Sequence, residues 1–323
     1  MVDIMNERRE LSIIIPHFNS VETLERLLVS IHKERNDKVE IIVVDDNSTK
    51  EVELFEKIKE KYYQNTKFLI NDTKKNSAGT CRNIGIKNAK GNWLLFCDSD
   101  DYLIEGWYAI VSQFFESEND VIFFAPRSID ETTGKPCGRE KKYEKLISNY
   151  LKNKYASDIR LRYNWGSPCS KLIKKSFVLA NNLTFENIMY ANDLLFSTKV
   201  GFYMTEFHAC IDNLYCITKG NNNLTSNKNE TAFWIKLEAK INKYFFLKNM
   251  ISEKKQLLLS GCIIDPLTML CKALKRGYSL AYIYKILKLY KSNNIHIITK
   301  DVLVYLLFYY PCINLKYNRD RNI

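Results

Sequence analysis

Residues 91–101 read GNWLLFCDSDD, a short apolar run that ends abruptly in a group of acidic side chains. The apolar part, Trp93–Cys97, has the length and composition of a strand that is buried on both faces. Asp98, Asp100 and Asp101 follow it directly. The sequence therefore predicts three carboxylates just beyond the carboxyl end of a buried strand.

Carboxylates one residue apart, such as Asp98 and Asp100, can bind the same divalent cation. Mg²⁺ and similar hard cations take oxygen ligands, usually one or two carboxylates together with phosphate oxygens of a substrate. A solvated acidic turn that caps a helix near Tyr102–Glu105 would have the same sequence. The motif alone does not separate a metal site from such a turn.

Two apolar runs upstream also end in polar residues. Residues 11–15 are followed by PHFN at 16–19, and residues 39–44 are followed by DDNS at 45–48. Helices are predicted between them and after them, at about 21–33 and 78–90, because the apolar residues there recur at helical spacing. Near-continuous apolar strands that alternate with helices indicate a mainly parallel sheet covered on both faces, with ligands bound beyond the carboxyl ends of its strands.

The polar residues at these strand ends suit a nucleotide, although each has a structural alternative. Phe18 can stack on a base or close the edge of the core. A carboxylate at 45–46 can accept from a base imide or a ribose hydroxyl, or cap the next helix. Arg82, early in its helix, can bind a diphosphate with two hydrogen bonds or form a surface ion pair.

Four segments in this order resemble the signature of family 2 glycosyltransferases, which are inverting enzymes of the GT-A fold. They are IIIPHFN at 13–19, VVDDNS at 43–48, CRNIGI at 81–86 and GNWLLFCDSDD at 91–101. The resemblance covers residues 11–124 and extends in looser form to about 226. It implies an α/β catalytic domain over 1–226, with a Rossmann-like, mainly parallel sheet flanked by helices. Within it, a nucleotide-sugar half would span about 1–125 and an acceptor half about 126–226.

The resemblance also implies roles at the donor site. Asp46 would contact uracil, Asp98 would hold the ribose or sugar side, and Asp100 would bind the metal that bridges the diphosphate. The full set of residues implied in nucleotide-sugar binding is Pro16, Phe18, Asn19, Asp46, Asp72, Arg82, Asp98, Ser99 and Lys219.

Further along, residues 165–172 resemble the acceptor-side segment of the family, which implicates Trp165 and Lys171. Residues 190–196 resemble the segment that carries the catalytic base, with Asn192 in place of the usual Glu and Asp193 retained as the base. The alternative for Asp193 is an acidic residue that favours the first turn of a helix. Residues 215–225 resemble a closing loop, or form an ordinary surface loop.

The implied reaction transfers one sugar to a hydroxyl group. The donor would be a nucleotide-diphosphate sugar, with UDP favoured, and Mn²⁺ or Mg²⁺ would be the cofactor. The transferred group would be a hexosyl or N-acetylhexosaminyl unit. The Q-x-x-R-W motif of processive synthases does not occur in the sequence. The acceptor would be a glycan or a polyprenyl-diphosphate-linked oligosaccharide in capsule or O-antigen synthesis. Bacterial relatives often build cell-surface polysaccharide on such a carrier.

Two other classes of protein share some of these features. Lys and Arg outnumber Asp and Glu by 48 to 37, giving a net charge of +11, which also suits a nucleic-acid-binding protein. Acidic groups at strand ends would repel a phosphate backbone, so we expect no nucleic-acid partner. A sugar-nucleotide nucleotidyltransferase would carry a Gly-rich, Arg-containing phosphate loop after the first strand, where this chain has PHFN.

The residues from 227 to 323 are expected to be mainly helical. A basic amphipathic helix is predicted at about 280–291, and the apolar segment 302–315 is too short to span a bilayer. These helices would lie on an anionic membrane surface, or pack as a bundle on the catalytic domain or a second subunit in a homo-oligomer. The nine cysteines show no zinc-binding spacing, and several of them, such as Cys97, lie inside apolar runs, which favours free buried thiols in a reducing cytosol. The polar N-terminus carries no apolar signal region. We therefore expect a cytoplasmic protein, with the inner face of the cell membrane as one site of action.

Overall fold

The fold is described from a computed structural model that covers residues 9–34, 36–220, 229–252 and 266–295. The chain divides into two units, Met1–Lys243 and Tyr244–Ile323. Residues 215–219 of the predicted closing loop belong to a strand, so the loop prediction was wrong there. Residues 221–225 of that loop and the apolar segment 302–315 lie outside the described residues.

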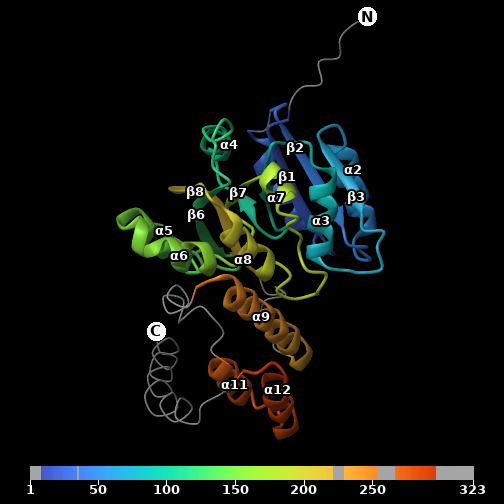
Figure 1. Cartoon of the computed structure of the whole chain (residues 1–323). Coiled ribbons are helices and arrows are strands. Elements are labelled where there is room, and N and C mark those ends of the chain that lie inside the picture. The colour runs from blue at the N-terminus through green and yellow to red at the C-terminus, as the bar shows by residue number, and fades with distance from the viewer. Residues whose placement is uncertain (1–8, 35, 221–228, 253–265, 296–323) are drawn as a thin grey trace, which may run out of the picture. The chain divides into compact units, whose positions relative to one another are not determined.

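In the described residues, the first unit is built on an eight-stranded sheet with the order β3-β2-β1-β4-β7-β6-β8-β5 (Figure 1). Its strands are β1 (Leu11–His17), β2 (Val39–Asp45), β3 (Thr66–Ile70), β4 (Trp93–Phe96), β5 (Tyr102–Leu103), β6 (Val121–Asp130), β7 (Lys171–Lys174) and β8 (Phe207–Lys219). Strands β3, β2, β1 and β4 are parallel, and the apolar runs predicted β2, β1 and β4. Strand β7 is antiparallel to both β4 and β6, so the sheet is mixed.

Helices cover both faces of this sheet. Alternate residues of β1 point to opposite faces: Ile13 and Ile15 pack with α1, α2 and α4, whereas Ile14 packs with α3, α5, α7 and α8. The helices of this unit are α1 (Val21–His32), α2 (Val52–Tyr62), α3 (Ala78–Asn88), α4 (Trp107–Ser112), α5 (Lys141–Lys152), α6 (Lys154–Asn164), α7 (Lys175–Ala180) and α8 (Leu194–Tyr203). The prediction of a sheet covered on both faces is confirmed.

The parallel register brings the polar strand ends to one edge of the sheet. His17 at the end of β1 pairs with Asp45 at the end of β2, and Asp45 pairs with Ile70 at the end of β3. Phe96 of β4 lies beside Ile14, so Asp98 follows at the same edge. The segments 16–19, 45–48 and 98–101 are therefore neighbours in space.

The second half of the sheet contains longer and less regular strands. Strand β6 continues to Asp130 and pairs with β8 up to Lys219, with register shifts after Phe124 and Ala125. Beyond β6 the chain turns back on itself as a hairpin, in which Ile129 forms an antiparallel bridge with Pro136.

The long helix α9 (Glu230–Met250) spans the boundary between the two units. In the second unit, α11 (Pro266–Lys275) packs against α12 (Leu280–Ser292). Within the described residues, no helix combines the length and the apolar character that a membrane span requires.

Candidate active site

Three carboxylates meet beyond the end of β4. Oxygen atoms of Asp98, Asp100 and Asp101 lie within 4.8 Å of one another, close enough to share one cation. Asp101 is already held by β8: it accepts hydrogen bonds from the hydroxyl of Tyr215 at 2.6 Å and from the backbone N–H of Thr218 at 2.7 Å. Asp98 and Asp100 are therefore the pair best placed to bind a metal, and Asp101 fixes their loop to the sheet.

The loop that carries the acidic cluster has further supports. The Tyr215 hydroxyl also accepts a hydrogen bond from the backbone N–H of Asp98 at 3.0 Å. The carbonyl oxygen of Asp100 accepts hydrogen bonds from the side chains of Arg26 and Thr218. Because the acid Asp101 bonds to β8, it does not cap a helix, and residues 102–103 form strand β5 rather than a helix.

Burial and mutual repulsion perturb the acidic cluster. Burial and the charge of Asp98 raise the pKa of Asp100 to about 6. Burial also raises the pKa of Asp101, helped by the charges of Asp100 and Asp98. A divalent cation between Asp98 and Asp100 would relieve this repulsion, and it would meet only the hard oxygen ligands that Mn²⁺ and Mg²⁺ accept. The residues present therefore fit such a metal.

Arg82 links the acidic cluster to the segment that precedes α8. One guanidinium nitrogen donates to Asp98 at 2.5 Å, and another donates to the side-chain oxygen of Asn192 at 2.9 Å. The side chain of Arg82 is only 5% exposed, whereas that of Asp98 is 40% exposed. Arg82 is thus a buried bridge, and the expectation of a surface ion pair is excluded.

Asp193 lies next to this bridge, at the start of α8. It stands at the N-cap position, where the helix dipole favours a negative charge, but its side chain makes no capping hydrogen bond to the helix. Burial raises the pKa of Asp193, and the charge of Asp98 raises it further, whereas Arg82 and Lys171 lower it. The carboxylate therefore shares an electrostatic environment with the acidic cluster.

The two acceptor-side residues occupy different environments. Trp165 is buried in the core, with its ring 5.2 Å from that of Phe123 and 4.5 Å from that of Tyr143. Lys171 is also buried, and its Nζ lies 5.4 Å from the centroid of the Phe123 ring. Burial lowers the pKa of Lys171 to about 7, while the charge of Asp193 opposes this shift.

The residues at the ends of β1 and β2 form a connected edge. Phe18 is 53% exposed and free to stack, whereas Pro16 is buried within β1. Asn19 accepts hydrogen bonds from the backbone N–H groups of Thr49 and Lys50, so it holds the neighbouring loop in place.

Asp46 is buried and accepts a hydrogen bond from Asn71 at 2.6 Å. Burial raises the pKa of Asp46, partly opposed by this hydrogen bond. The neighbouring Asp72 is exposed. Asp45 bonds the side chain and backbone of Ser48, which closes the turn before α2.

The last two expected donor-site residues are engaged within the protein. The hydroxyl of Ser99 lies 2.9 Å from that of Ser20. Lys219 forms an exposed ion pair with Asp130 at 2.7 Å, at the end of β8. Its side chain would have to leave Asp130 to reach a diphosphate.

Sequence reasoning missed Tyr215, Thr218 and Asn71, which hold the acidic residues in place. Tyr215 lies 114 residues from Asp101, on a strand that was not predicted. Asn71 stands immediately before Asp72, where the carboxylate drew attention and the amide did not.

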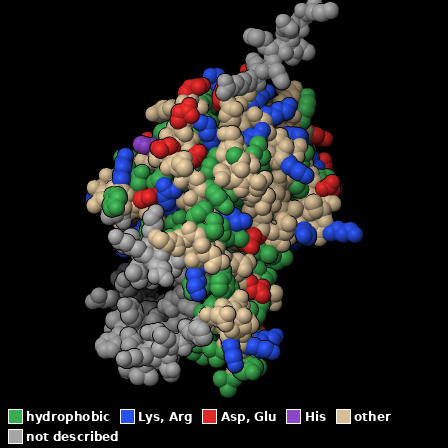
Figure 2. Space-filling view, in the orientation of Figure 1, with side chains coloured by type: hydrophobic (Ala, Val, Ile, Leu, Met, Phe, Trp, Pro, Cys, Tyr) green, Lys and Arg blue, Asp and Glu red, His purple; other side chains and the backbone are tan. Residues whose placement is uncertain are grey.

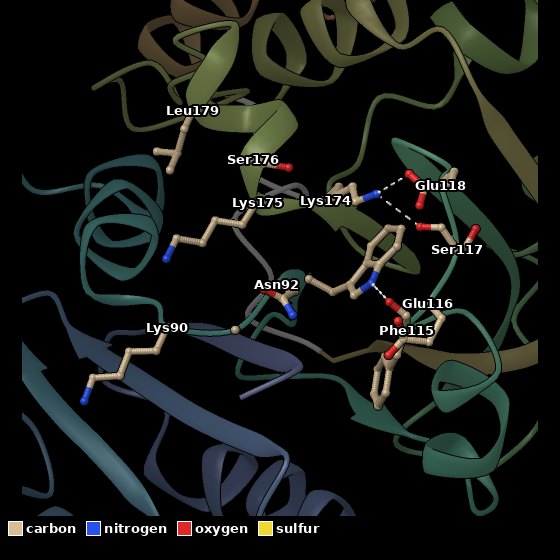
Figure 3. A pocket seen from close by; sticks show the side chains of 12 residues that line it. Lys90, Asn92, Phe115, Glu116, Ser117, Glu118, Lys174, Lys175, Ser176 and Leu179 are labelled. Atoms are coloured by element: carbon tan, nitrogen blue, oxygen red, sulfur yellow. Dashed lines mark hydrogen bonds and ion pairs between the residues drawn. The ribbon is translucent and has the colours of Figure 1, made fainter. Parts of the chain in front are cut away.

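A separate cavity of about 360 Å³ opens at the other end of β4, where Trp93 begins the strand (Figure 3). Two of its lysines have partners: Lys174 binds Glu118 and the carbonyl of Ser117, and Lys175 binds the carbonyl of Ala89. The cavity contains none of the strand-end residues described above.

Comparisons with known proteins identify a family of transferases. Residues 12–172 match the model of glycosyl transferase family 2. The chain is 32% identical over 123 residues to the poly(ribitol-phosphate) beta-N-acetylglucosaminyltransferase TarS of Staphylococcus aureus, a match that covers 37% of this chain and 21% of TarS. It is 26% identical over 301 residues to the cholesterol galactosyltransferase of Borreliella burgdorferi, a match that covers 83% of this chain and 81% of that protein. The matches to an uncharacterized glycosyltransferase of Haemophilus influenzae and to TarS span 37% and 21% of those relatives.

Solved structures share the fold. The crystal structure of S. aureus TarS 1–349 in complex with UDP-GlcNAc superposes with a TM-score of 0.61 and 23% identity, over 82% of this chain and 73% of that one. The mannosyltransferase PcManGT from Pyrobaculum calidifontis, in complex with GDP-Man and Mn²⁺, superposes with a TM-score of 0.56 and 15% identity, over 94% of this chain and 86% of that one. The mixed sheet with its flanking helices is thus the GT-A fold of these transferases. With the match over residues 12–172, it follows that the chain belongs to glycosyl transferase family 2.

Proposed function

We propose that the protein is a metal-dependent, inverting glycosyltransferase that moves a single sugar from a UDP-sugar donor to a hydroxyl group. The observation that carries the proposal is the link from Asp98 through Arg82 to Asn192, because it joins the acidic cluster to the segment of Asp193. The base Asp193 and the acidic cluster that binds the donor would then face the same reaction centre.

The donor would bind along the carboxyl edge of the sheet. Phe18 would stack on the base, Asp46 and Asp72 would lie near its polar edge, and Asp98 and Asp100 would hold Mn²⁺ or Mg²⁺. The ion would offset the negative charge that develops on the diphosphate as it leaves. The complexes of TarS with UDP-GlcNAc and of PcManGT with GDP-Man and Mn²⁺ support a nucleotide sugar and a divalent cation here.

Arg82 would contribute fixed positive charge beside the leaving group. Its buried guanidinium holds Asp98 in position, and it needs no rearrangement during the reaction. Lys219 would add a second positive charge only after its ion pair with Asp130 opens.

Asp193 would act as the general base. It would take the proton from the acceptor hydroxyl as the hydroxyl oxygen attacks the anomeric carbon from the face opposite the diphosphate. The bond between that carbon and the phosphate oxygen breaks, so the configuration inverts without a protein nucleophile. Its raised pKa brings Asp193 closer to the range in which a carboxylate is an effective base.

The acceptor is proposed to be a glycan or a lipid-linked oligosaccharide of cell-surface polysaccharide. The names of two relatives point to the cell envelope, one acting on poly(ribitol-phosphate) and one on cholesterol. Lys171, near Asp193, would border the acceptor, whereas the buried Trp165 would support this wall from the core.

The experiment is a panel of nucleotide sugars assayed for release of the nucleoside diphosphate, with Mn²⁺ and with EDTA. We expect release from one donor class, dependent on metal. The Asp193→Asn variant should bind UDP as the wild type does but lose most release, and Asp212→Asn, at an exposed site on β8, is the matched control. Turnover by Asp193→Asn close to that of the control would refute the base assignment.

A further inference from the structure

The second unit carries a helix with two apolar faces. On α12, Tyr282, Ile283, Ile286 and Tyr290 are buried. Leu280, Tyr284 and Leu287, at spacings of four and three residues, lie along a different side of the helix and are 85%, 68% and 41% exposed. One face therefore packs within the protein, and a second apolar stripe meets solvent.

The charge around this stripe has a single sign. Residues 266–295 contain no Asp or Glu, whereas they contain the basic residues Lys272, Lys275, Arg276, Lys285, Lys288 and Lys291. Lys285, Lys288 and Lys291 are exposed on α12 itself. On α11, Leu274 is 50% exposed and stands beside the exposed Lys275. On the face drawn in Figure 2, hydrophobic and basic side chains lie side by side where Figure 1 labels α12.

We propose that the exposed stripe of α12, with its flanking lysines, binds the surface of an anionic lipid bilayer. The stripe would enter the boundary between headgroups and acyl chains, and the lysine ammonium groups would remain among the anionic headgroups. This inference does not rest on the proposed function, since binding to lipid requires no sugar nucleotide.

The chemistry of the surface favours a bilayer over other occupants. A second copy of the chain would bring the same six basic residues against each other, with no acidic side chain from this segment to offset them. A nucleic acid would match the lysines, but its phosphate backbone offers nothing to Leu280, Tyr284 and Leu287. A bilayer with anionic headgroups matches both features of the surface.

The test is flotation of the full-length chain with vesicles of phosphatidylcholine and phosphatidylglycerol, compared with phosphatidylcholine alone. We expect binding to the mixed vesicles that weakens as salt is raised. The triple variant Leu280→Ser, Tyr284→Ser, Leu287→Ser should bind at least roughly tenfold more weakly, because its apolar area is lost. The triple variant Lys285→Gln, Lys288→Gln, Lys291→Gln should bind the mixed vesicles roughly a hundredfold more weakly, because each lysine contributes about fivefold to the affinity.

Matched controls come from exposed residues of the first unit. They are Tyr63→Ser, Tyr155→Ser and Ile211→Ser for the apolar set, and Lys57→Gln, Lys87→Gln and Lys152→Gln for the basic set. Both control variants should bind as the wild type does. If a control variant lost as much vesicle binding as its α12 counterpart, the proposal would be overturned. It would also be overturned if the wild type bound neutral vesicles as strongly as the mixed vesicles. Dimerisation abolished by the α12 variants, without vesicle binding, would assign the surface to a second copy instead.

Because the substituted side chains are exposed, thermal unfolding of each variant should match that of the wild type. UDP titration with Mn²⁺ on the same samples separates this proposal from the proposed function. Loss of vesicle binding with unchanged UDP binding supports the surface assigned here. Absence of UDP binding in the wild type would reject the proposed donor and leave the vesicle result standing.

Discussion

Replacement of Tyr215 by Phe tests how the acidic loop is held. The hydroxyl of Tyr215 donates to Asp101 at 2.6 Å and accepts the backbone N–H of Asp98 at 3.0 Å, and the side chain is fully buried. Tyr215→Phe keeps the ring and removes both hydrogen bonds. Asp101 then retains only the N–H of Thr218 among the hydrogen bonds described here.

The expected cost follows from these two bonds. A hydrogen bond to a charged group contributes about 1.5–3 kcal/mol, and one to a neutral amide contributes about 0.5–1.5 kcal/mol. We therefore expect Tyr215→Phe to lower the free energy of unfolding by about 2–4 kcal/mol, with a fall in Tm of roughly 5–15 °C for a domain of this size. The pKa of Asp101 should rise further, because the Tyr215 hydrogen bond lowers it.

The measurement is thermal and urea unfolding of the wild type and of Tyr215→Phe. Tyr143→Phe is the control, because the ring of Tyr143 is also buried but its hydroxyl makes no hydrogen bond in the part of the chain that the structure describes. The Tyr143→Phe variant should stay within about 1 kcal/mol of the wild type. A Tyr215→Phe protein as stable as this control would show that the hydroxyl does not hold the loop.

Three further predictions concern the same site. Affinity for Mn²⁺ should rise as pH increases through about 6, because the raised pKa of Asp100 lets protons compete with the metal below that value. Calorimetric titrations of Mn²⁺ between pH 5 and 8 measure this affinity, and an affinity that does not change with pH would contradict the prediction. Lys171→Met should shift the acidic limb of the pH–rate profile to higher pH, because Lys171 lowers the pKa of Asp193; an unmoved limb would argue against their interaction. Gly79→Ala should destabilise the protein by roughly 1–3 kcal/mol, because its Cβ would clash with the carbonyl oxygen of Glu186; unchanged urea unfolding would oppose this.

The sequence was sufficient to predict the half of the fold in which the apolar pattern of the strands matches their burial. The runs at 11–15, 39–44 and 93–97 are apolar because they are buried on both faces, so both the parallel sheet and its polar strand ends could be predicted. Strand β8 could not, because its first half alternates irregularly between exposed and buried residues and its pairing with β6 shifts register.

The same limit applies to the site. The carboxylates Asp98, Asp100 and Asp101 can be recognised in the sequence, because they are charged and directly follow a buried strand. Their supports, Tyr215 on β8 and Asn71 after β3, are ordinary side chains whose roles arise only from tertiary contacts. Long-range hydrogen bonds of this kind leave no local spacing for a sequence to reveal.

In the proposed reaction, Asp98 and Asp100 hold a divalent cation against the diphosphate of a nucleotide sugar. The most direct measurement is calorimetric titration of UDP into the wild type, Asp100→Asn and the control Asp212→Asn, each with Mn²⁺ and with EDTA. We expect Mn²⁺ to strengthen UDP binding in the wild type and in Asp212→Asn, and Asp100→Asn to lose this gain while remaining folded. Full Mn²⁺-dependent UDP binding by Asp100→Asn would contradict this expectation.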